Sequence, residues 1–87
     1  MKTLVQIMAE QREGKHITQA QLAELSGINQ AHISRIENGN SKPTMPTIFR
    51  ICKALEIDPL LLADILAEEF RQHVGNSSSV EKKLHTA

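Results

Sequence analysis

The stretch that decides the fold is TQAQLAELSGINQAH, residues 18–32. Two short amphipathic segments, residues 19–25 and residues 30–37, are separated by four residues that include a glycine and an asparagine. This spacing is typical of a helix-turn-helix, whose second helix can enter the major groove of DNA. The residues therefore favour a DNA-binding module.

The local chemistry of this stretch fits two helices joined by a sharp corner. Thr18 and Gln21 have the spacing of a capping box, and Asn29 is a good N-cap for the second helix. Gly27 falls in the turn, where it can take a positive φ without steric cost. The residues that we expect to point inward are Leu22, Ala23, Leu25, Ile33 and Ile36.

Composition limits what the rest of the chain can form. The chain has 87 residues, of which 40% are apolar, and its only aromatic residues are two phenylalanines. A core of aliphatic side chains favours packed helices over a sheet, so we expect one all-α domain. No apolar run approaches the ~18 residues of a membrane span, and the N-terminal apolar stretch is too short and too polar for an export signal.

Three further helices are predicted around the corner. Residues 3–13 have helical apolar spacing, and Gly14 follows where a left-handed C-terminal residue would lie. Thr44 is expected to cap a fourth helix. Its core stripe is predicted to consist of Ile48, Ile51, Cys52 and Leu55, so the thiol of Cys52 should be buried and inert.

The fifth helix is expected to begin at Asp58-Pro59, because proline suits the first helical position, and to run toward His73. The polar Gly-Asn-Ser stretch that follows indicates a flexible segment. We therefore expect a DNA-binding domain at residues 1–74 and a flexible C-terminal tail at residues 75–87.

The longer pattern resembles a known family. It comprises residues 17–28, residues 33–39, Pro43-Thr44 and residues 54–57, and it is similar to the phage repressor and Cro-type helix-turn-helix family, also called the Xre family. The resemblance covers about residues 3–66. It implies a compact five-helix, lambda repressor-like fold that acts as a dimer on an inverted-repeat operator, most often in repression. It also implies a cytoplasmic protein of a prokaryote, associated with the nucleoid or encoded by a phage.

The residues predicted to read bases lie on the outer side of the second corner helix. They are Gln30, Ala31, Ser34 and Arg35. Gln30 can pair with adenine and Ala31 can contact a thymine methyl, whereas Arg35 can reach guanine or a phosphate. The alternative for Arg35 is an ordinary solvated charge.

A second group is predicted to hold the DNA backbone. Gln19 lies at a helix N-terminus, which favours phosphate, and the resemblance implies that it also braces Gln30. The resemblance further implies an ion pair between Arg12 and Glu37. The residues predicted to contact phosphate are Gln19, His32, Asn38, Asn40, Lys42 and the outer edge of Arg12. Each also has a plainer interpretation: an exposed glutamine, a surface histidine, a polar turn or a structural arginine.

The net charge of zero argues for weak binding to DNA. Residues 12–50 carry a net charge of +2, whereas the fifth helix and the turn before it are acidic. We expect a slope of log K against log salt of about −2 to −4 per protomer, at roughly −0.9 per phosphate contacted. Dimerisation would compensate for the weak affinity of one domain.

The fifth helix is a candidate for that dimerisation. Its inner residues, Leu61, Leu62 and Ile65, are expected to complete the core, and its outer residues, Leu66, Phe70 and Val74, are expected to meet a second copy. Glu56 departs from the resemblance, because the family often has glycine there. A left-handed residue at that place would cost about 1 kcal/mol, or else the turn must differ.

Two other classes of protein compete with the DNA-binding interpretation. An enzyme is not indicated, because the histidines have no metal-ligand spacing and no nucleophile stands beside a base. We expect no cofactor and no metal. The alternative to a repressor is an antitoxin-type autoregulator or an interaction module that binds a toxin or other protein partner through the fifth helix.

Overall fold

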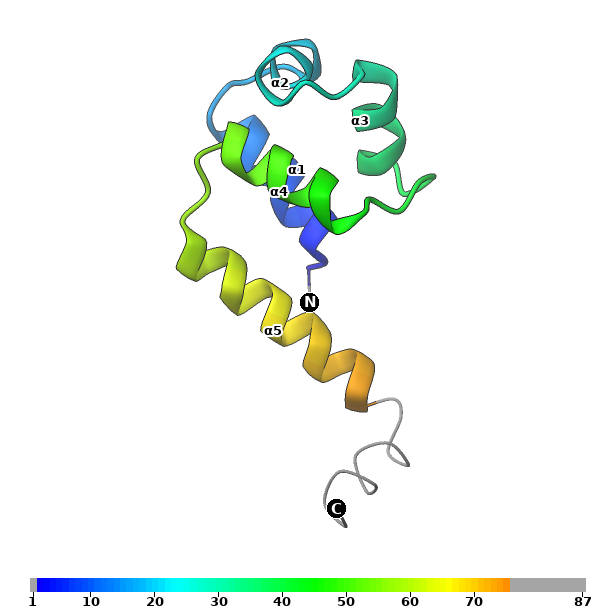
Figure 1. The fold of residues 1–87 in the computed structure, drawn as a ribbon, viewed down its shortest axis with the longest axis vertical. Helices are drawn as coiled ribbons and strands as arrows, with labels where there is room; N and C mark the ends of the chain where they lie inside the picture. Colours follow the sequence, from blue (N-terminus) through cyan, green and yellow to red (C-terminus); the bar gives the residue numbers. More distant parts are fainter. Residues whose placement is uncertain (1, 76–87) are drawn as a thin grey trace.

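The computed structural model describes residues 2–75, and every regular element in that part of the chain is a helix. The elements are α1 (Leu4–Gly14), α2 (Gln19–Ser26), α3 (Gln30–Glu37), α4 (Met45–Ala54) and α5 (Pro59–Gly75). The predicted all-α fold is confirmed. Figure 1 shows α1 to α4 gathered into one body, from which α5 extends to one side.

The core lies between the first four helices and the start of α5. Leu22, Ile33, Ile36 and Leu55 are each 1% exposed and form its centre. The predicted stripe of α4 is buried as expected, and burial raises the pKa of the Cys52 thiol. Ile65 is the one fully buried residue of α5 in residues 2–75, while Leu62 and Leu66 pack against the core from its edge.

The corner between α2 and α3 forms as predicted. The hydroxyl of Thr18 accepts a hydrogen bond from the backbone N–H of Gln21, and the Gln21 side chain accepts one from the backbone N–H of Thr18. Gly27 ends α2 at φ 72°, and the side chain of Asn29 caps α3 by accepting from the backbone N–H of Ala31. The capping box, the left-handed glycine and the asparagine cap together fix the angle at which α3 leaves α2.

Helices α1, α3 and α4 end in the same kind of turn. His16, Gly39 and Glu56 have φ values of 58°, 80° and 53°, and the residue after each donates its N–H to a carbonyl five residues earlier. This is the Schellman pattern. The prediction for α1 was wrong, because its left-handed residue is His16 and Gly14 belongs to the helix.

Two leucines predicted to point inward do not. Leu25 is 61% exposed, because an eight-residue helix buries only the narrow stripe around Leu22 and no element of residues 2–75 covers the edge where Leu25 lies. Leu61 is 39% exposed, because the first turn of α5 turns Leu62 and Ile65 toward the core and leaves Leu61 at the margin.

Helix α5 starts at Pro59 as predicted, with the Asp58 side chain accepting from the backbone N–H of Leu60. It runs to Gly75, so that glycine is helical and not part of a tail. The rest of the predicted tail, residues 76–87, lies outside the described residues. Within the described part of the chain, no helix is both long enough and apolar enough to cross a membrane.

Candidate nucleic-acid interface

The outward face of α3 carries the side chains that were predicted to read bases. Gln30, Ala31 and Arg35 are exposed, and Ser34 is half-buried beside them. The opposite face of this helix holds Ile33 and Ile36 in the core. The helix is thus fixed by its apolar side and presents one short polar strip to solvent.

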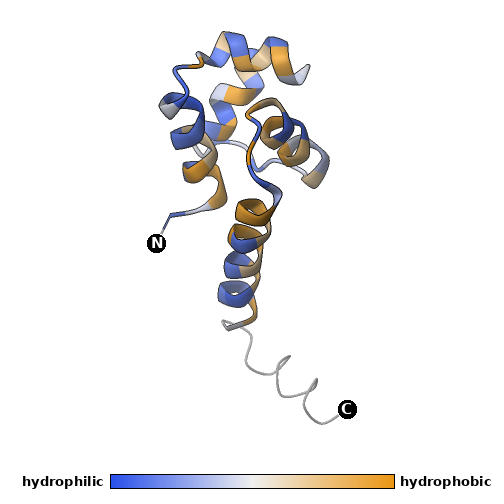
Figure 2. Ribbon diagram, turned by 90° about the vertical axis from the view of Figure 1, so that its left-hand side faces the viewer, coloured by the Kyte–Doolittle hydropathy of each residue, from blue (hydrophilic) through white to orange (hydrophobic). Residues whose placement is uncertain are grey.

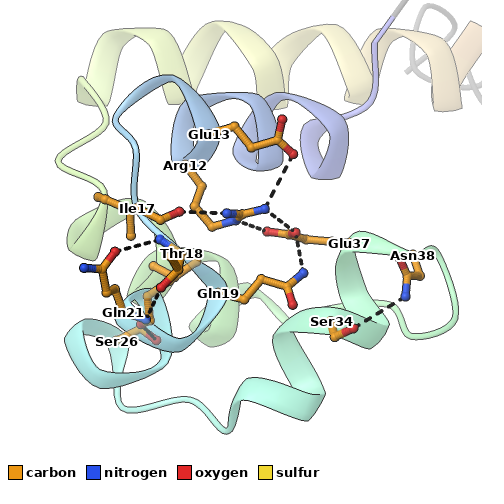
Figure 3. A network of polar contacts seen from close by, with 11 residues as sticks. Arg12, Glu13, Ile17, Thr18, Gln19, Gln21, Ser26, Ser34, Glu37 and Asn38 are labelled. Carbon is orange, nitrogen blue, oxygen red and sulfur yellow. Dashed lines mark hydrogen bonds and ion pairs between the residues drawn. The ribbon is translucent and has the colours of Figure 1, made fainter.

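A partly buried ion pair ties the end of α3 to α1. Arg12 Nε donates to Glu37 Oε2 at 2.8 Å, and Arg12 Nη2 donates to Glu37 Oε1 at 3.0 Å. Arg12 Nη1 also donates to the carbonyl of Ile17 at 2.7 Å. The two charged side chains are only 11% and 14% exposed. Figure 3 shows the pair from close by. The ion pair implied by the family resemblance is therefore present, and it is bidentate.

The same carboxylate holds Gln19. Gln19 Nε2 donates to Glu37 Oε1 at 2.9 Å, so one carboxylate joins side chains from α1, α2 and α3 (Figure 3). The hydrogen bond described for the Gln19 amide goes to Glu37, and the brace that the resemblance implied between Gln19 and Gln30 stays a prediction. The first turn of α2 is thereby locked to the last turn of α3.

The electrostatics of this cluster favour its charged form. Burial by itself would raise the pKa of Glu37, but the hydrogen bonds from Arg12 and Gln19 and the positive charge of Arg12 outweigh it, and the pKa is lowered. The hydrogen bond to Glu37 likewise raises the pKa of Arg12. The cluster is therefore an ion pair at neutral pH and works as a structural clamp.

This clamp bears on the predicted phosphate contact of Arg12. Its Nε and both Nη atoms already have protein partners, including Glu13 at 3.5 Å from Nη2, and little of its side chain reaches solvent. In the structure Arg12 holds α1 and α3 together, and the phosphate contact of its outer edge stays a prediction.

Three of the other predicted backbone contacts, Asn38, Asn40 and Lys42, follow directly after α3. Gly39 allows the tight turn, and the N–H of Asn40 donates to the carbonyl of Arg35 at 2.8 Å. Asn38 Nδ2 lies 3.5 Å from Ser34 Oγ, a long hydrogen bond. Lys42 is exposed, and His32 is half-buried on the flank of α3.

The cations of the described chain fall into two groups. Among residues 2–75, the ion pairs employ Lys2, Arg12 and Arg71, and Lys15 donates to the backbone carbonyl of Leu55. Arg35, Lys42, Arg50 and Lys53 are in none of these ion pairs. Arg35 lies on α3 and Lys42 in the loop after it, so these two charges can meet an anionic partner of α3.

A sequence model of the family described as "Helix-turn-helix" matches residues 8–62, which is more than half of the chain and includes the corner and the clamp. The chain belongs to the helix-turn-helix family.

Several relatives of this helix-turn-helix chain are known by sequence. It is 38% identical over 52 residues to an uncharacterised HTH-type transcriptional regulator of Mycobacterium tuberculosis, covering 60% of this chain and 37% of that protein. It is 40% identical over 50 residues to the cryptic phage CTXphi transcriptional repressor RstR of Vibrio cholerae, covering 58% of this chain and 45% of that protein. The chain thus spans less than half the length of these relatives.

A solved structure extends the likeness to three dimensions. The crystal structure of the wild-type restriction-modification controller protein C.Esp1396I matches with a TM-score of 0.68 and 27% sequence identity. The match covers 77% of this chain and 86% of the controller protein. The five-helix arrangement is therefore that of a helix-turn-helix regulator.

Proposed function

We propose that this chain binds double-stranded DNA and represses transcription, with the N-terminal half of α3 in the major groove. The observation that carries the proposal is the rigid presentation of α3, which has two isoleucines in the core and its last residue held by the clamp. A helix that reads bases must be held in one orientation while its outer face stays free. The phage repressor among the relatives supports the regulatory role.

Roles follow from where each side chain lies. Gln30 and Ala31, at the exposed start of α3, can reach the edges of adenine and thymine, while Arg35 and Ser34 lie one turn further along. Gln19 offers an N–H of its amide and the N-terminus of α2 to a phosphate, and Lys42 with Asn38, Asn40 and His32 can flank the strand.

Matched arginine substitutions test the groove-docking model. Arg35 and Arg50 are both exposed and outside the ion pairs of residues 2–75, but Arg50 is on α4, away from α3. On a duplex selected from a random pool, Arg35→Ala should weaken binding by about 10-fold or more, and Arg50→Ala should not. The wild-type slope of log K against log salt should be about −2 to −4 per protomer. A slope near zero would contradict the model.

We also propose that α5 joins two copies of the chain. Figure 2 shows α5 apolar along one side and polar along the other. Leu66 packs against the core of its own chain, but Phe70 is 67% exposed and Val74 is half-buried one turn later. The predicted interface is therefore centred on Phe70, and a two-fold dimer would space two α3 helices by about 34 Å, one turn of DNA.

Sedimentation equilibrium tests the dimer. Phe70→Ala should raise the dissociation constant of the dimer by about 30-fold, as for an aromatic hot spot. Leu25→Ala removes an equally exposed apolar side chain from α2 and should leave association unchanged. A wild-type protein that stays monomeric at high micromolar concentration would contradict this proposal.

A protein partner such as a toxin is the alternative to operator binding. The double variant Gln30→Ala with Arg35→Ala separates the two, because a pure interaction module would keep its activity and a repressor would lose its site preference. The bacterial and phage relatives support a cytoplasmic place of action next to the chromosome.

A further inference from the structure

We propose that Glu69 is a positioning residue that sets the angle of α5 and thereby the distance between the two DNA half-sites that a dimer reads. This inference rests on the proposed function. Glu69 makes a contact between the two ends of the described chain.

The contact is a hydrogen bond between residues near the two ends of the described chain. Glu69 Oε1 accepts from the backbone N–H of Leu4 at 2.6 Å, although the two residues are 65 positions apart. Leu4 is the first residue of α1, and its side chain is buried. Glu69 is itself half-buried, so the bond is partly shielded from water.

The N-terminus of α1 lacks an acidic residue of its own. Thr3 and Gln6 form a capping box, which satisfies the N–H of Gln6 and of Thr3, but the first turn of α1 contains no Asp or Glu. A carboxylate near a helix N-terminus is favoured by the N–H groups and the dipole there, and a bond to a charged acceptor is stronger than a neutral one. Glu69 supplies that carboxylate from α5.

Because of the position of Glu69 along α5, this bond orients the outer part of the helix. The core cluster of residues 2–75 includes Leu62, Ile65 and Leu66 from α5 and nothing beyond them. Glu69 holds the helix one turn further out, immediately before Phe70, the centre of the proposed interface. The bond therefore fixes the part of α5 that the core does not.

Small changes of angle matter because α5 is long. Its 17 residues span about 25 Å, so a tilt of about 10° moves one end by about 4 Å relative to the other. One base pair rises about 3.4 Å, and two-fold symmetry applies the tilt to both copies. A loosened α5 would let the dimer accept half-sites at more than one separation.

The test uses the full chain and duplex pools in which two half-sites are separated by spacers that differ by single base pairs. Wild type should prefer one spacer. In Glu69→Ala, the ratio of affinities for that spacer and for the neighbouring ones should fall by about 10-fold. The half-site sequence that this variant selects should stay the same. Glu69→Gln retains an oxygen that can accept from Leu4 and should restore most of the preference.

Asp64→Ala is the matched control, because Asp64 is an exposed acid of α5 and its removal changes the charge equally. It should keep the wild-type spacer profile. If Glu69→Ala also keeps that profile, the positioning role is overturned while the DNA-binding proposal stands. If wild type binds no paired half-sites, the proposed function fails and this inference fails with it.

A second measurement guards against a variant that folds poorly. The amide proton resonance of Leu4 should move upfield in Glu69→Ala relative to wild type, and much less in Asp64→Ala. An unchanged Leu4 resonance in a folded Glu69→Ala protein would show that the bond is absent in solution, and would overturn the proposal.

Discussion

The corner and α5 hold their charges in opposite ways. In the corner, Arg12 and Glu37 form a partly buried bidentate pair that, together with Gln19, joins three helices. On α5, Arg71 pairs with Glu68 one turn away within the same helix, and both side chains are exposed. The first arrangement fixes relative positions of helices, whereas the second stabilises only its own turn. The charges at the corner therefore join separate helices, whereas the Arg71–Glu68 pair leaves the placement of α5 to the core and to Glu69.

Removing one charge from each ion pair should give the largest difference in the free energy of unfolding. Glu37→Ala leaves the partly buried Arg12 guanidinium without its counterpart and should lower the free energy of unfolding by about 2 kcal/mol. Glu68→Ala should cost at most about 1 kcal/mol, because exposed pairs contribute little. Urea unfolding followed by circular dichroism measures both. Equal losses would mean that the clamp behaves as a surface pair.

Acid should weaken the clamp at the corner. The folded-state pKa of Glu37 is lowered, so the protonated unfolded state is favoured as pH falls. The stability from the clamp is thus complete above the unfolded value of about 4.3 and is lost as pH falls toward the lower folded pKa. Glu37→Gln should remove this part of the pH dependence of unfolding, so its free energy should fall less between pH 5 and pH 3 than that of wild type. A parallel decline would contradict the assignment.

The corner was predictable from sequence because its signals are local. Thr18 with Gln21, Gly27 and Asn29 each act within a few residues, and each appears in the structure as predicted. Arg12 and Glu37 are 25 positions apart, and their ion pair was predicted only from the family resemblance. The exposure of Leu25 depends on which helices cover the edge of α2, which periodicity alone does not contain.

The contacts that sequence reasoning missed join distant segments. Glu69 with Leu4 and Lys15 with the Leu55 carbonyl both tie a side chain to the backbone at a helix end. Any of several acids or lysines has the right chemistry, and only the packed fold selects one. His16 as a left-handed residue was also hidden, because Gly14 offered the more obvious stop.

The two capping boxes should differ less in how much each contributes to the free energy of unfolding. Thr18 caps α2 at the corner, and Thr3 caps α1, where Glu69 also accepts from the first N–H. Thr18→Ala should cost about 1 kcal/mol of unfolding free energy. Thr3→Ala should cost less, because α1 keeps a carboxylate at its N-terminus. Thermal denaturation of the two variants compares them directly, and Thr18→Ser, which keeps the hydroxyl, should match wild type. A larger loss for Thr3→Ala would reverse the expected order.

The smallest effect is expected at the turn that connects the body to α5. Glu56 ends α4 at φ 53°, a conformation that costs a residue with a Cβ about 1 kcal/mol and costs glycine little. Glu56→Gly should therefore raise the free energy of unfolding by about 0.5 kcal/mol, since the freer unfolded chain offsets part of the relief. Glu56→Ala removes the same carboxylate without relieving the backbone, so it isolates the conformational part. If the glycine variant is no more stable than the alanine variant in urea, the left-handed turn is not strained. A more stable glycine variant with an unchanged half-site spacer preference would show that Glu69, and not the rigidity of this turn, sets the angle of α5.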